Sequence, residues 1–451
     1  MSRAQRAEPE PAPVRPFQVP EVVALETDEG LRIRVAPKSR FPLVSVVLTV
    51  DAGEAALPID RSGHASLTAS AMQGGTERRG GAELAEALEG IGASLSVSAG
   101  WDATRISLKV LADRMEEALD LFAEVVRLPS FPAEEVDRVR NQRLAAIGQE
   151  LAQPSSLADR SVMRSVYADE SPYSRPRGGT KESVSAFDSA AARAQLEAAF
   201  GPEIGVAVAG DVDPSEFRDL LAARFAGWGT RRERAPVPEA TARTGERRIY
   251  VVARPGAVQS EIRIGHPGVA RDNPDYFPLR VFNATLGGTF TSRLNLNLRE
   301  ENGFTYGVRS RFMFRRGRGP FLISTAVETA VTAAAVRETM KELHGLVIDG
   351  PSAAEVASVR DYMAGVFPLQ METTGQLASQ LASLILYDLP ADYLASYRDR
   401  IRAVTPAEAA AAGRMHVHPE QVAIVVVGDP DSVVPELEAL DLGPVQVEEP
   451  A

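Results

Sequence analysis

The chain contains no cysteine. It therefore has no disulfide, no thiolate metal site and no cysteine nucleophile. Long apolar runs are also absent, and no stretch approaches the length of a membrane span. Positive charge is in deficit, because 49 Lys and Arg against 61 Asp and Glu give 49 − 61 = −12. That balance argues against a surface built for nucleic acid or anionic membrane.

The N-terminal stretch MSRAQRAEPEPAPVRPFQVP has early arginines but no apolar centre. It is therefore not a complete signal peptide, and its Pro/Ala/Glu composition predicts a flexible lead-in. Arginine clusters occur locally, as in Arg315-Arg316-Gly317-Arg318. Such a cluster is compatible with a basic patch, although it is more typical of a solvated loop.

What the chain does have is the composition of a globular protein. It is 451 residues long, with 44% hydrophobic and 24% charged residues. That length exceeds one ordinary hydrophobic core and predicts two or more domains.

An internal duplication organises the chain. The helix-entry segment PAEEVDRVR (Pro132–Arg140) recurs as SAAEVASVR (Ser352–Arg360), an offset of 352 − 132 = 220 residues. The same offset relates further pairs: Leu157-Ala158 with Leu377-Ala378, Tyr167 with Tyr387, and Val184 with Val404. Gly74-Gly75-Thr76 also recurs as Gly287-Gly288-Thr289, at an offset of 213, and the Gly-Asp turn at Gly210 recurs at Gly428, at an offset of 218. A series at nearly constant offset indicates two homologous halves.

The duplication predicts the domain boundaries. We expect a flexible lead-in (1–19), a first domain (20–229), a linker (230–245), a second domain (246–442) and a tail (443–451). The linker is polar and contains prolines, as linkers commonly do.

Within each copy, strand-like segments precede helical ones. Strands are predicted at 31–35, 43–50, 94–98, 104–110, 248–252, 261–265, 308–314 and 321–326. Helices are predicted at 63–73, 114–127, 133–152, 214–225, 275–286, 332–348 and 353–367. Strands followed by runs of helices favour an α+β fold, in which each domain has a mainly antiparallel sheet packed with helices.

The segment LGGTFTSRLNLNLREENGFTYGV (Leu286–Val308) carries the strongest functional signal. Arg299 and Tyr306 lie seven residues apart, across a break where Gly303 is expected to end a helix. A strand is expected from Phe304 onward. Buried or half-buried, the two side chains could donate hydrogen bonds to one carbonyl or carboxylate. The alternative is an arginine paired with a local glutamate and a tyrosine in the core.

The first copy contains the predicted helix GHASLTASAMQGGT (Gly63–Thr76). Together with the two-copy plan, it resembles the pitrilysin/insulinase/mitochondrial-processing-peptidase family of zinc metallopeptidases, the inverzincins. In that family the helix carries HxxEH, which places two histidine ligands on one face and a glutamate as general base. Alignment puts Ser66, Ala69 and Ser70 at those positions, so no metal is expected on this chain. His64 lies two residues early, on a different helix face.

The other candidate ligands are sparse. The family's third ligand is a glutamate on a downstream helix, and in that region Glu150 is the acidic residue. One carboxylate alone would not hold zinc. His416 and His418 stand two residues apart and are either a two-histidine site or ordinary surface histidines.

SRLNLNLREENGFTYGV also resembles the signature of the family's second domain. The resemblance implies that Arg299 and Tyr306 hold substrate and stabilise the oxyanion, as catalytic and substrate-binding residues. It further implies a heterodimer, in which this chain forms half of a clam-shell chamber and a homologous partner chain binds the zinc. A peptide or unfolded protein would be captured along an edge strand. The periplasm is the expected compartment, with the cytoplasm as the alternative.

Two other interpretations remain. The chain could be a non-catalytic structural or peptide-binding member of the same superfamily, which would have no need of both Arg299 and Tyr306. It could also be an active zinc peptidase by itself, but the alignment supplies no ligands for that. On the favoured interpretation, the chain has no peptidase activity alone and contributes to it when paired.

Overall fold

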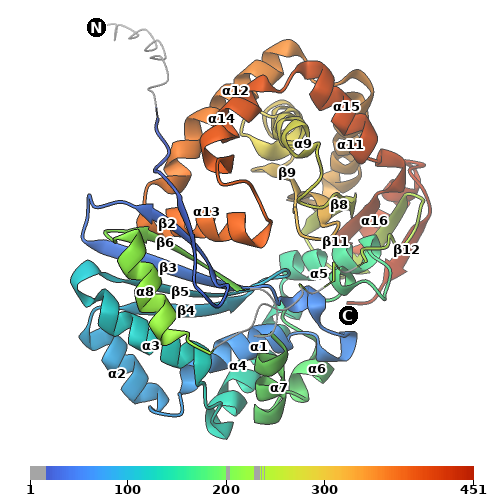
Figure 1. The fold of residues 1–451 in the computed structure, drawn as a ribbon. Coiled ribbons are helices and arrows are strands. Elements are labelled where there is room, and N and C mark those ends of the chain that lie inside the picture. Colours follow the sequence, from blue (N-terminus) through green and yellow to red (C-terminus); the bar gives the residue numbers. More distant parts are fainter. Residues whose placement is uncertain (1–16, 200–203, 228–233, 235, 238, 451) are drawn as a thin grey trace, which may run out of the picture.

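The computed structural model describes residues 17–199, 204–227, 234, 236–237 and 239–450 (Figure 1). Most of the expected lead-in and part of the expected linker lie outside these residues. Phe17 and Val19, which were expected to be flexible, instead pack against a buried hydrophobic cluster. Their apolar rings and methyl groups are removed from water there, which favours an ordered position.

The first sheet has six strands in the order β1-β2-β6-β3-β5-β4. Their bounds are β1 Val23–Glu26, β2 Arg32–Pro37, β3 Leu43–Val50, β4 Ser94–Ala99, β5 Thr104–Leu111 and β6 Ile204–Gly210. β3 is buried along nearly its whole length. That burial accounts for its continuous run of β-branched and aliphatic residues, because helices cover both of its faces.

The second sheet repeats this plan in the order β12-β7-β11-β8-β10-β9. Its strands are β7 Arg248–Ala253, β8 Gln259–Pro267, β9 Val308–Phe312, β10 Pro320–Glu328, β11 Ala423–Gly428 and β12 Val445–Glu448. β12 pairs with β7. The stretch 443–451 was expected to be a tail, so its placement outside the second domain was wrong.

Both sheets are mainly antiparallel, which confirms the predicted α+β fold. β2 pairs parallel with β6 in the first sheet, and β7 pairs parallel with β11 and β12 in the second. The other neighbouring strands pair antiparallel. β4 and β9 are the corresponding edge strands at one side of each sheet.

Helices pack on the faces of both sheets (Figure 1). Those of the first half are α1 His64–Ala71, α2 Gly81–Gly90, α3 Met115–Arg127, α4 Ala133–Ala152, α5 Pro154–Val166, α6 Lys181–Ser185, α7 Ser189–Ala199 and α8 Pro214–Arg224. Those of the second half are α9 Tyr276–Asn283, α10 Arg293–Asn295, α11 Thr332–Asp349, α12 Ala353–Val366, α13 Thr374–Leu386, α14 Tyr393–Ala403, α15 Pro406–His416 and α16 Pro430–Glu438. Two π-helical segments, Ala284–Gly288 and Leu296–Glu301, flank α10.

The two halves exchange a helix. α13 belongs to the second half but packs on β3 and β6 of the first sheet, and α5 belongs to the first half but packs on β8 and β11 of the second. Figure 1 shows α13 beside β2 and β6, and α5 close to β11. The buried clusters around these helices therefore contain residues from both halves. The two halves therefore share hydrophobic cores and are not independently packed domains.

None of the helices in the described residues combines the length and apolarity needed to cross a bilayer.

Candidate functional site: an arginine-lined cleft beside a helix without zinc ligands

α1 stands where the resemblance places a zinc-binding helix. It starts after Gly63, whose φ of 88° is left-handed and suits a residue without a Cβ. Ala69 is buried, and Ser70 Oγ donates a hydrogen bond to the carbonyl oxygen of Ser66 at 2.9 Å. His64 is also buried, and its Nε2 lies 2.9 Å from the carbonyl oxygen of Ser183. Burial lowers the pKa of His64, which keeps the ring neutral.

Glu150, the acidic residue expected near the third ligand position, has a different partner. Arg143, on the same helix α4, donates to its two carboxylate oxygens at 2.5 and 2.9 Å. Arg143 Nε also donates to the carbonyl oxygen of Gly178 at 2.7 Å. This bidentate pairing uses one lone pair on each carboxylate oxygen and places a positive charge beside them, which opposes the binding of a metal cation.

The donor set around α1 does not fit zinc. Two serines and an alanine replace the expected ligands, and the neighbouring carboxylate is bound by arginine. Across residues 17–450, apart from the undescribed gaps, no group of three or more His, Asp or Glu residues is arranged to hold a metal ion.

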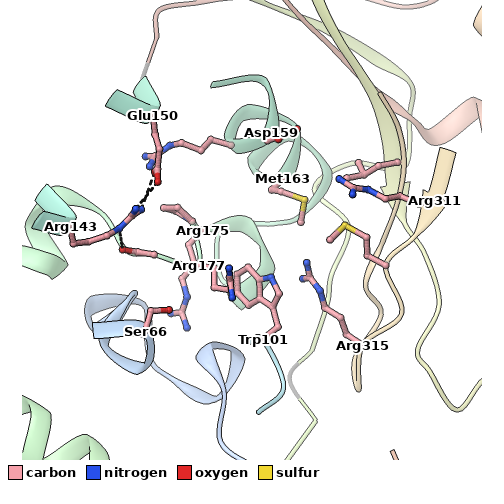
Figure 2. A pocket seen from close by; sticks show the side chains of 15 residues that line it. Ser66, Trp101, Arg143, Glu150, Asp159, Met163, Arg175, Arg177, Arg311 and Arg315 are labelled. Atoms are coloured by element: carbon pink, nitrogen blue, oxygen red, sulfur yellow. Dashed lines mark hydrogen bonds and ion pairs between the residues drawn. The ribbon is translucent and has the colours of Figure 1, made fainter. Parts of the chain in front are cut away.

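A cleft of about 470 Å³ opens beside α1 at the junction of the two halves (Figure 2). Ser66 and Glu150 line it from the first half, and Met313 and Leu322 line it from the second. Six arginines line the same cleft: Arg143, Arg160, Arg175, Arg177, Arg311 and Arg315. No sequence pattern predicted this group, because its members come from several separate segments.

Arg315 was expected, as part of a charged cluster, to be solvated. The structure contradicts this, since only 5% of its surface is exposed. Its guanidinium carbon lies 4.5 Å from the ring centre of Trp101 and 4.4 Å from that of Tyr173. These cation–π contacts hold the group in place, while burial lowers the pKa of Arg315. Because the pKa of arginine starts so high, the side chain remains charged.

Arg175 is the second buried arginine of the cleft, with 7% of its surface exposed. Its Nη2 donates to the carbonyl oxygens of Glu54 at 2.8 Å and Leu57 at 2.5 Å. The carboxyl group of Glu54 accepts a hydrogen bond from the backbone N–H of Gly63, at the start of α1. Burial nevertheless raises the pKa of Glu54 to about 7.

Arg299 and Tyr306 lie on the segment between α10 and β9. Arg299 is half-buried in the π-helical segment, its guanidinium carbon 4.2 Å from the ring centre of Phe290 and one nitrogen 3.5 Å from Glu300 Oε1. Tyr306 is fully exposed, and 69% of Phe290 is exposed as well. The interpretation of Tyr306 as a core or half-buried residue is therefore wrong.

The backbone between the two residues was partly predicted. Gly303 has the expected positive φ, at 65°. The strand was expected from Phe304, but β9 begins only at Val308. Thr305 Oγ1 accepts a hydrogen bond from the N–H of Gly307 at 3.1 Å, so a turn occupies this stretch. The described contacts do not join Arg299 to Tyr306, and only Tyr306 is fully exposed.

His416 and His418 do not converge. His416 Nε2 lies 2.8 Å from Asp275 Oδ2. The ring of His418 lies 5.4 Å, between centres, from that of His266. His266 is buried, which lowers its pKa to about 4. The two-histidine site is therefore not formed by these contacts.

Comparison with known proteins identifies relatives in both halves. Residues 34–180 match the family described as Insulinase (Peptidase family M16), and residues 202–363 match the Peptidase M16 inactive domain. An uncharacterized zinc protease of Mycobacterium leprae is 27% identical over 68% of this chain and 69% of its own length. A protein of Helicobacter pylori described as a non-peptidase homolog is 25% identical over 78% of this chain and 81% of its own.

Solved structures agree with this relationship. A crystal structure described as a peptidase M16 inactive domain from Pseudomonas fluorescens has a TM-score of 0.85 and 27% identity, covering 91% of this chain and 98% of its own. The fold is shared with the periplasmic protease PqqL of Escherichia coli, at a TM-score of 0.77 and 16% identity, over 92% of this chain and 46% of that one. With both halves matched by the same family and the fold reproduced over nearly the whole chain, this protein is a member of the insulinase-like M16 peptidase family, and its second half matches the family's inactive domain.

Proposed function

We propose that this chain is the zinc-free subunit of a heterodimeric M16 metalloendopeptidase. The observation that carries the proposal is the full exposure of Tyr306, seven residues after the half-buried Arg299. Two hydrogen-bond donors at a surface turn are available to a molecule outside the chain. Their role would be to hold a peptide whose scissile bond is cleaved at the partner's metal.

The chain's own α1 supports a non-catalytic assignment, because Ser66, Ala69 and Ser70 replace the ligands that zinc requires. The match to the family's inactive domain points the same way. The relative from Helicobacter pylori described as a non-peptidase homolog is consistent with it.

The chemistry assigned to the pair is electrostatic. When water attacks a peptide carbonyl, negative charge develops on its oxygen, and donors already aimed at that oxygen lower the barrier. The Arg299 guanidinium and the Tyr306 hydroxyl would be those donors. Removing one such donor from a preorganised site typically reduces kcat by about 10²- to 10³-fold.

Substrate capture is proposed to use main-chain pairing along an edge strand. β9 follows the Tyr306 turn directly and forms the edge of the second sheet. A peptide added to this edge would be bound through its backbone, with little dependence on its sequence. The proposed compartment is the periplasm, which fractionation of the source cells tests.

The decisive experiment is co-purification of the chain from its source, followed by peptidase assays with and without a chelator. The chain alone should be inactive, and addition of an HxxEH-bearing M16 partner should give chelator-sensitive activity. Arg299→Ala and Tyr306→Phe should reduce that activity. Matched controls are Arg337→Ala, at an exposed position of α11, and Tyr362→Phe, at an exposed position of α12. Full activity in both test variants would contradict the assigned roles.

The second candidate is a structural or peptide-binding protein without a catalytic partner. A neighbouring gene for a similar-length HxxEH protein would favour the peptidase pair, and failure to co-purify with any such protein would favour this alternative. Metal analysis of the purified chain addresses independent peptidase activity. Stoichiometric zinc on the chain alone would contradict the proposed function.

A further inference from the structure

The cleft beside α1 concentrates positive charge in an acidic protein. Its two lining carboxylates are already neutralised, Glu150 by Arg143 and Asp159 by Arg263, whose Nε lies 2.6 Å from Asp159 Oδ1. The remaining lining arginines make no ion pair with a carboxylate among the described residues. The chain carries a net charge of −12, so this local excess of positive charge is not a consequence of composition.

Several guanidinium nitrogens in the cleft lack a partner. Arg315 Nη1, Arg175 Nε, Arg175 Nη1 and Arg160 Nη1 are buried and have no hydrogen-bond acceptor among the described residues. Arg315 and Arg175 are both more than nine-tenths buried. Leaving a buried donor unsatisfied is costly, and more so for a charged group. An anion that accepts from these nitrogens would remove that penalty.

The walls of the cleft are partly apolar. The indole of Trp101, the thioethers of Met163 and Met313, and the side chain of Leu322 line the space between the arginines. Figure 2 shows Arg311 and Arg315 entering from the second half, opposite Ser66 and Arg143 of the first. A small hydrated anion would gain no binding energy from apolar walls. A peptide with both carboxylate and apolar side chains would pack its apolar groups against them. Methionine adapts readily to different apolar partners.

We propose that this cleft binds the acidic side chains of a peptide, with its apolar neighbours against Trp101 and the methionines. The volume of about 470 Å³ lies within the usual range of roughly 300–1,000 Å³ for ligand pockets. Carboxylates suit the site because they accept bidentate hydrogen bonds from arginine. This deepens the proposed function, since it names a substrate class, but binding itself needs neither a partner chain nor zinc.

The test is isothermal titration calorimetry on the full chain. The probe is a peptide of alternating glutamate and leucine with a blocked N terminus and an amidated C terminus, and its counterpart replaces every glutamate by glutamine. We expect the acidic peptide to bind at least tenfold more tightly than the glutamine peptide. Its affinity should fall as NaCl is raised, because ion pairing is screened.

Variants locate the binding in the cleft. Arg315→Gln should weaken binding of the acidic peptide at least tenfold, and Arg311→Gln, at the exposed rim, about threefold. Arg218→Gln is the matched control, because it removes the same charge from an exposed position on α8, where its partner is Asp219. Circular dichroism and thermal unfolding check the fold of each variant. Should Arg315→Gln fail to fold, Arg311→Gln and Arg177→Gln decide the outcome.

Four results would overturn the proposal. The acidic peptide could fail to bind, or bind no better than the glutamine peptide. The cleft variants, with their fold intact, could bind like wild type. The affinity for inorganic phosphate, but not for the acidic peptide, could depend on Arg315 and Arg311. That result would assign the cleft to small anions. Loss of the proposed partner activity would leave these measurements unchanged, so the two proposals fail independently.

Discussion

Leu157 and Leu377 occupy equivalent positions in the two halves, and each is buried against the sheet of the opposite half. Leu157, on α5, packs with residues of the second sheet such as Val425. Leu377, on α13, packs with residues of the first sheet such as Val47. A single duplicated helix therefore contributes twice to the junction between the halves, once in each direction.

Truncating either leucine should destabilise the whole chain. Leu157→Ala and Leu377→Ala each remove a fully buried side chain, which typically costs about 2–5 kcal/mol of unfolding free energy. Urea unfolding should give one transition in each variant, moved to lower urea. Leu369→Ala is the control, because 60% of Leu369 is exposed and its change should stay within about 0.5 kcal/mol. A variant that loses only one half, with two separate transitions, would contradict the shared core.

Changes at Arg299 and Tyr306 should leave stability intact. Tyr306 is fully exposed, so Tyr306→Phe should alter the free energy of unfolding by no more than about 0.5 kcal/mol. Arg299→Ala should also have little effect, because its ion pair with Glu300 is at the surface. Thermal unfolding checks both variants. A large stability loss in either would mean that the residue supports the fold, and any loss of paired activity could then be structural.

Glu54 should make stability depend on pH. Its pKa is raised from 4.5 to about 7 by burial, so the folded protein binds its proton more tightly than the unfolded chain does. Stability is therefore fullest below pH 4.5 and falls as pH rises through 7, by on the order of 3 kcal/mol. Glu54→Gln should flatten this dependence. Urea unfolding between pH 4.5 and pH 8 measures it, and equal slopes for wild type and variant would refute the assignment.

Glu355 should show the opposite dependence. Arg293 donates to both its carboxylate oxygens, at 2.6 and 2.9 Å, and these hydrogen bonds lower its pKa to about 2. Glu355 also accepts from the N–H of Ser352 in the capping box of α12. Its contribution is present above pH 4.5 and is lost as pH falls through 2.

Substitution at the duplicated glutamate gives a matched comparison. Glu355→Gln should cost about 1–3 kcal/mol at neutral pH, since a charge-assisted pair and a cap are both weakened. Glu135, 220 residues earlier, pairs with an exposed Arg138, and Glu135→Gln should cost less than about 1 kcal/mol. Chemical unfolding of both variants at pH 7 tests this. Equal losses would show that the Arg293 pair adds nothing.

Much of the fold follows from the sequence. The strand at 43–50 and the helix at 133–152 have the predicted bounds, since each has a long, consistent hydrophobic pattern. The exchange of α5 and α13 could not be predicted in the same way. The constant offset shows that the helices are equivalent, but either sheet could receive their apolar faces.

The candidate site was predictable only in part. The loss of zinc ligands is visible in one short helix, because Ser66, Ala69 and Ser70 align with the His, Glu and His of the HxxEH motif. The arginine cleft was not visible, since its residues meet only after the two halves fold together. Arg315 shows why composition misleads. Within one charged run, the aromatic rings of Trp101 and Tyr173 cover the guanidinium of Arg315, whereas Arg316 is half-buried and Arg318 is exposed.

The exchanged helices also bear on how the molecule can move. A hinge between the halves would have to strip α5 from β8 and β11 and α13 from β3 and β6, exposing apolar surface on both sheets. The chain should therefore behave as one rigid shell. A chamber built from it and a second chain would open at the seam between the chains, so the rate of substrate entry would be governed by subunit contacts.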